Sequence, residues 1–112
     1  MPIRVELRSE RGEVVRGLSD PAGGTFDAVD LDRVLPQVAE PPTSPPFRLL
    51  CYVDPYGNTV FNQWQMVDLL MDIERVAGHD LKPGERRGFE LLRVMAERCR
   101  DSVHLYLWFI GD

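Results

Sequence analysis

Hydrophobic residues occupy every second position at the start of the chain. Ile3, Val5 and Leu7 are separated by charged residues, which is typical of a β-strand with one buried and one solvated face. Residues 9–12 contain turn-forming side chains, and residues 13–18 can return beside the first strand. The pattern therefore predicts an N-terminal β-hairpin.

The following segment is rich in residues that break regular structure. After a turn over residues 19–24, Asp27 or Asp30 can cap a short helix that Pro36 ends. Residues 41–46 include four prolines, which lack the backbone donor that helices and strands require. We expect a short helix here, and then a proline-rich surface loop.

A second hairpin is predicted around residues 54–57. An apolar run over residues 47–53 precedes the sequence Asp-Pro-Tyr-Gly, which suits a type I turn in which Gly57 can adopt the left-handed conformation. The apolar residues that follow can form the returning strand. Asn62 and Gln65 then have the spacing of a capping box, so the strand should lead directly into a helix.

The first long helix is expected over residues 63–77. Its apolar side chains occupy most of the circumference at 100° per residue, and leave one narrow polar stripe. That stripe consists of Gln65, Asp68, Asp72 and Arg75. A helix of this kind needs cover on nearly every side, by the rest of the fold or by a partner, and a homodimer built on it would explain the narrow stripe.

The last third of the chain predicts a second helix and a strand. A helix over residues 83–100 should bury Phe89, Leu92, Met95, Ala96 and Cys99. Gly88 would allow it to approach the first helix closely. Residues 103–110 are apolar or aromatic on both faces apart from His104, as expected for a central strand buried from two sides.

These elements predict an α+β fold. The 112 residues suffice for one domain, residues 1–112, in which a mostly antiparallel sheet is packed on one face by the two long helices. The sheet would be made from the two hairpins and the final strand. We expect 44% hydrophobic residues to supply one core without disulfides or metal.

Charge and cysteine content narrow the classes of function. The net charge of −5 disfavours a general nucleic-acid binder, and the arginines of the second helix are interleaved with glutamates. Cys51 and Cys99 belong to no metal-binding or redox motif, so both are expected to be free, buried thiols, and no metal or cofactor is predicted. No signal peptide or membrane-spanning stretch is recognisable, which predicts a cytoplasmic protein without membrane contact.

Four acidic residues form the first candidate site. Asp20, Asp27, Asp30 and Asp32 have no basic residue among them and occupy a turn-rich segment. An exposed acidic segment can steer and pair with a basic protein partner. The same residues are also common caps and turn formers, so both interpretations remain open.

A second candidate site combines Asp54, Asp68, Asp72 and His104. Asp68 and Asp72 lie one helical turn apart, where two carboxylates could share a cation or divide acid and base roles. His104 alternates with Tyr106 and Trp108 on the last strand and could line an aromatic pocket. A solvated stripe and ordinary core packing account for the same residues.

The stretch from Tyr52 to Asn62 (YVDPYGNTVFN), taken with the ending VHLYLWFIG, resembles small uncharacterised proteins common in actinobacteria. In size, acidity and absence of a catalytic motif the chain is also similar to immunity proteins that block toxins by surface binding. The first resemblance implies no activity. The net charge, the acids from Asp20 to Asp32 and the absence of a catalytic motif, together with the similarity to immunity proteins, predict a non-enzymatic protein-binding module, such as an immunity or antitoxin-like inhibitor acting through its acidic surface. The alternative is a small enzyme or ligand-binding domain at the second candidate site.

Overall fold

A four-stranded antiparallel sheet forms one layer of the protein. The structure is a computed structural model that describes residues 2–32 and 47–111. The strand order is β4-β1-β6-β5, with bounds of Ala28–Asp32, Pro2–Ser9, Leu105–Ile110 and Asn58–Phe61. A separate two-stranded ribbon pairs β2 (Leu18–Ser19) with β3 (Thr25–Phe26).

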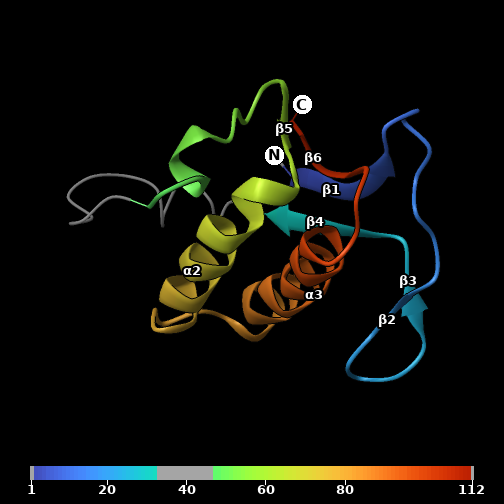
Figure 1. The fold of residues 1–112 in the computed structure, drawn as a ribbon. Coiled ribbons are helices and arrows are strands. Elements are labelled where there is room, and N and C mark those ends of the chain that lie inside the picture. The colour runs from blue at the N-terminus through green and yellow to red at the C-terminus, as the bar shows by residue number, and fades with distance from the viewer. Residues whose placement is uncertain (1, 33–46, 112) are drawn as a thin grey trace.

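Two helices cover one face of the sheet (Figure 1). Helix α3 (Pro83–Arg100) lies against β4, β1 and β6, and α2 (Met66–Ala77) packs beside α3. Two short 3₁₀ turns, η1 (Leu50–Tyr52) and η2 (Gln63–Gln65), flank β5. The sheet and helices share one hydrophobic core, which confirms the predicted α+β fold.

The first strand lies inside the sheet, and its alternation is confirmed. Ile3, Val5 and Leu7 are buried. The predicted N-terminal hairpin is wrong as a strand pair, because the returning chain makes only the bridge between Arg8 and Val14. The neighbours of β1 are β4, which alternates apolar and acidic residues, and β6, which is apolar or aromatic throughout. Residues 13–18 offer neither pattern, because Arg16 and Gly17 interrupt them.

The short helix predicted after Asp27 or Asp30 is also wrong over its described part. Residues 28–32 form β4, and its Val29 and Leu31 point into the core in register with Leu31↔Ile3 and Val29↔Val5. The opportunity to pair with β1 outweighs a weak capping signal. The rest of that predicted helix and the proline-rich loop 41–46 lie outside the described residues.

The predicted hairpin around residues 54–57 is present only as its turn. Asp54 accepts a hydrogen bond from the backbone N–H of Tyr56 at 2.9 Å, but β5 pairs with β6 and not with residues 47–53. Those residues instead form an irregular segment that contains η1. Gly57 does not have a positive φ, so the left-handed conformation predicted there is not adopted.

Both long helices are confirmed. The capping box forms at η2: Asn62 accepts from the N–H of Gln65 at 3.2 Å, and the Gln65 side chain accepts from the N–H of Asn62 at 2.9 Å. Helix α3 has the predicted bounds and buries the predicted residues. The close approach at Gly88 is to β4 rather than to α2, because a Cβ there would lie 3.1 Å from Leu31 Cδ2.

The last strand is interior, as predicted, but it begins at Leu105, after the exposed Val103 and His104, and it is not buried from two sides. Leu107 and Phe109 are inaccessible, whereas Trp108, on the face away from the helices, is partly exposed. The guanidinium of Arg8 lies 4.5 Å from the centre of the Trp108 ring. The Arg8 side chain therefore covers the Trp108 ring, on the face of β6 that a second layer of structure was expected to bury.

Candidate functional site

Three large apolar side chains are exposed along one side of α2 and its preceding turn. Trp64, Val67 and Met71 have exposed fractions of 86%, 58% and 43%. They are three and four residues apart, so they follow one another along the same side of the helix. We call these three residues the α2 stripe.

The stripe arises because the buried side of α2 differs from the predicted one. Met66, Leu69, Ile73 and Val76 are buried, and so is Asp72, which was expected on the solvated side. The Asp72 carboxylate accepts the backbone N–H groups of Arg48, Leu49 and Leu50 at 2.8, 2.7 and 3.0 Å. These bonds fix Asp72 in the interior and leave part of the apolar circumference uncovered.

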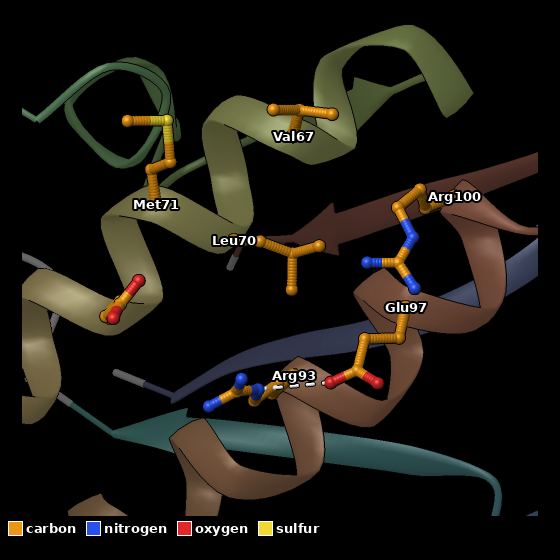
Figure 2. Close-up of a pocket in the computed structure, with 7 residues that line it drawn as sticks. Val67, Leu70, Met71, Arg93, Glu97 and Arg100 are labelled. Carbon is orange, nitrogen blue, oxygen red and sulfur yellow. Dashed lines mark hydrogen bonds and ion pairs between the residues drawn. The ribbon is translucent and has the colours of Figure 1, made fainter.

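A groove of about 340 Å³ lies between α2 and α3, and two residues of the stripe, Val67 and Met71, contribute to its lining (Figure 2). Its α2 wall consists of Val67, Leu70, Met71 and Glu74, and its α3 wall of Arg93, Glu97 and Arg100. Leu70 points into the space between the helices, and Val67 and Met71 lie on the outer side of α2. A smaller hollow of about 160 Å³ continues along the same two helices and shares Arg93.

The charges of the groove are only partly paired. Arg93 and Glu97 form an ion pair at 3.0 Å, and Arg100 pairs with Asp101 at 2.8 Å. The hydrogen bond between these two raises the pKa of Arg100 and lowers that of Asp101. Glu74 has no ion-pair partner within residues 2–32 and 47–111. The groove thus combines an apolar wall with one carboxylate that is open to a new partner.

A second hollow of about 290 Å³ adjoins Trp64. It is lined by Asn62, Gln63, Trp64, Val103, His104, Leu105 and Tyr106. His104 has a φ of 68°, which is uncommon for a residue other than glycine, and its ring lies 3.0 Å from the Glu10 carboxylate. His104 and Tyr106 therefore do share a hollow, and its most exposed aromatic side chain is Trp64 of the stripe.

The four acidic residues of the first candidate site are placed differently from one another. Asp20 pairs with Arg87 of α3, and Asp27 accepts the N–H of Gly17 at 2.7 Å. Asp30 is exposed on β4, and Asp32 ends the same strand.

The contacts of Asp20 and Asp27 within the fold leave less of the acidic segment free to bind a partner. The hydrogen bond from Arg87, with a second one from the N–H of Ala22, lowers the pKa of Asp20. Asp27 also lies 3.6 Å from Arg16. Two of the four carboxylates are thus already engaged within the fold, as the turn and cap interpretation requires.

The residues of the second candidate site make separate contacts. Asp68 pairs with the side chain of Arg48 at 3.0 Å, and Asp72 accepts the backbone N–H of the same residue. The two carboxylates therefore lie near each other, but both hold residues 48–50. Asp54 closes its turn, and His104 pairs with Glu10. No hydrogen bond or ion pair among the described residues joins His104 to any of the three carboxylates.

The cysteines are free, but only one is buried as predicted. Cys99 is inaccessible, and burial raises the pKa of its thiol to about 11. Cys51 is exposed, because η1 replaces the strand that would have placed it in the core. Within the described residues, no group of three or more His, Cys, Asp or Glu side chains could hold a metal ion, and no helix could span a membrane.

Comparisons with protein-family models, with curated protein sequences and with solved structures found no match to this chain. Function is therefore inferred from the surface of the protein itself. The sequence pattern predicts that α2 is covered on nearly every side, by the rest of the fold or by a partner, and does not single out the three residues of the stripe. A signal was present in the sequence: apolar residues 64, 67 and 71 repeat at helical spacing outside the core set 66, 69, 73 and 76.

Proposed function

We propose that this chain is a protein-binding domain that acts through the α2 stripe rather than an enzyme. The observation that carries the proposal is the exposure of Trp64, Val67 and Met71 beside a groove. Isolated surface apolar residues are common, but three large ones in a row, including a tryptophan, are typical of binding hot spots. Apolar ridges of this spacing bind partners by helix packing.

The surrounding charges support the same proposal. A typical interface has an apolar centre and a charged rim that gives specificity. Val67 and Met71 of the stripe share their groove with the charged residues Glu74, Arg93, Glu97 and Arg100. The second candidate site has less support, because each of its carboxylates already serves a turn or a backbone segment.

An inhibitor of the immunity type is a narrower form of this proposal. It would place the contact at Asp20, Asp27, Asp30 and Asp32. Among the three whose side chains the structure describes, Asp20 and Asp27 are engaged within the fold and Asp30 is exposed. Substitution of Asp30 by asparagine separates the two surfaces. If the acidic segment binds a basic target, this change should slow association, whereas binding through the stripe should be unaffected.

The test of the proposal is capture with two matched variants. Immobilised wild-type protein is incubated with lysate of its own host, retained proteins are identified, and binding of each is measured again after purification. Trp64→Glu should weaken that binding by at least about tenfold, since it replaces the largest apolar side chain of the stripe with a charge. Tyr56→Glu is the control, because Tyr56 is a similarly exposed aromatic residue, at 76%, outside the stripe.

Two results would contradict the proposal. One is a set of purified partners, the untagged chain itself included, whose affinities are the same for wild type and Trp64→Glu. The other is loss of folding in Trp64→Glu alone, which circular dichroism would reveal, since Trp64 would then have a structural role that its exposure argues against.

A further inference from the structure

The α2 stripe is complementary to itself when two copies are placed antiparallel. Its ends differ: Trp64 is large and flat, Met71 is flexible, and Val67 lies between them. Seven residues span about 10 Å of helix. A two-fold axis through Val67 therefore places Trp64 of each copy against Met71 of the other, a favourable pairing of an aromatic ring with a thioether.

The charges at the two ends of the groove agree with this arrangement. The side chain of Gln63 donates to the Arg100 carbonyl at 2.8 Å, so Arg100 lies beside the N-terminal end of α2. Glu74 lies near the C-terminal end of the same helix. In an antiparallel pair, Glu74 of each copy meets the end of the groove where Arg100 of the other copy lies. Each Glu74 carboxylate, which has no ion-pair partner among the described residues of its own copy, then gains one.

We infer that the partner of the α2 stripe is a second copy of this chain, bound about a two-fold axis near Val67 with Glu74 and Arg100 paired between copies. The inference rests on the proposed function and names its partner. A foreign amphipathic helix could also contact the three apolar residues. The second copy is favoured because it supplies both the apolar and the charged complement from residues already present on this surface.

The first experiment measures self-association. Sedimentation equilibrium of the full chain should show a dimer, and Trp64→Glu should raise the dimer dissociation constant at least about tenfold. Tyr56→Glu should leave it unchanged. A wild type that is monomeric up to about 1 mM, or a dimer with the same affinity in Trp64→Glu, overturns the inference.

A charge exchange tests the orientation. Glu74→Arg should weaken the dimer by about three- to tenfold, because it places two like-charged pairs across the axis. Glu74→Arg combined with Arg100→Glu should restore the affinity of the wild type. If the double variant is as weak as the single variant, the copies are not antiparallel along α2 and the inferred arrangement is wrong.

Disulfide trapping locates the axis without relying on destabilising variants. In a Cys51→Ser background, Val67→Cys should oxidise to a covalent dimer, because a residue on a two-fold axis meets its own counterpart. Tyr56→Cys is the exposed control and should remain monomeric. If Val67→Cys and Tyr56→Cys are trapped with equal efficiency, the disulfides reflect random collision, and the two-fold axis near Val67 is contradicted.

The outcomes for self-association and for protein binding are distinguishable. A monomeric wild type that binds a purified foreign protein through Trp64 overturns the second copy as partner and leaves the binding surface in place. A dimer that depends on Trp64 and is restored by the charge exchange supports both. Insensitivity of self-association and of foreign binding to Trp64→Glu overturns both.

Discussion

Two aspartates one helical turn apart show how strongly the tertiary environment decides a residue's role. Asp68 is partly exposed and pairs with the side chain of Arg48. Asp72 is buried and accepts three backbone N–H groups. A segment without regular strand pairing needs partners for its buried N–H groups, and the Asp72 carboxylate supplies them for three successive residues.

We predict that Asp72→Asn destabilises the protein by about 2 kcal/mol, whereas Asp68→Asn costs less than about 1 kcal/mol. The amide has a single acceptor oxygen and brings an N–H₂ group among donors, so buried N–H groups lose their partner. The free energy of unfolding from urea titrations measures both effects. Equal losses in the two variants would show that Asp72 is not the anchor of residues 48–50.

At the scale of elements, local sequence signals predicted the two long helices, but they did not predict which strands pair with one another. The capping box at Asn62 and the proline at the start of α3 mark helix ends through contacts within a few residues. By contrast, the partner of β5 is β6, more than forty residues along the chain, and not the neighbouring apolar run 47–53. Local sequence carries little information on such distant pairing, which explains both wrong hairpins and the missed strand β4.

The capping box gives a prediction at this scale. Asn62→Ala should lower the free energy of unfolding by about 1 kcal/mol, because the N–H of Gln65 loses its side-chain acceptor at the start of the helix and keeps only the Asn62 carbonyl. Asn62→Ser retains a side-chain oxygen at the cap and should recover most of the loss. Thermal melting followed by circular dichroism compares the three proteins. A serine variant as unstable as the alanine variant would contradict the capping role.

At the scale of the whole molecule, arginine–carboxylate contacts join parts of the fold that are distant in sequence. Arg87 of α3 holds Asp20, which follows β2, and so ties the small ribbon to the helical layer.

A second arginine–carboxylate cluster lies within β1, on the outer face of the sheet. Burial alone would raise the pKa of Glu6. Hydrogen bonds from Arg8 and Arg4, at 3.0 Å each, outweigh burial and lower that pKa.

The lowered pKa of Asp20 predicts how stability depends on pH. Because the folded carboxyl has a pKa below the ordinary aspartate value of 3.8, the Arg87 contact stabilises the fold fully above that value, and this stabilisation is lost as the pH falls through the folded pKa. Wild type should therefore lose more stability between about pH 6 and about pH 2 than Asp20→Asn does. Urea titrations across this range provide the measurement.

Asp30→Asn is the matched control for that pH series. Asp30 belongs to the same acidic group but has no ion-pair partner among the residues that the structure describes. Its variant should follow the wild-type pH dependence. If Asp20→Asn and Asp30→Asn both follow the wild type, the Asp20 contact contributes nothing to the acid sensitivity.

The sequence by itself determined the α+β class, both long helices with their ends, the buried face of α3 and the interior position of the last strand. These features depend on periodicity, capping and proline placement, which act over one or two turns. Only the tertiary structure decided which strands pair and which side of α2 is covered. The apolar residues of α2 occupy most of its circumference, so periodicity alone did not decide which of them are covered. In the fold, Asp72 lies on the covered side, where it accepts the N–H groups of residues 48–50, and Trp64, Val67 and Met71 stay exposed.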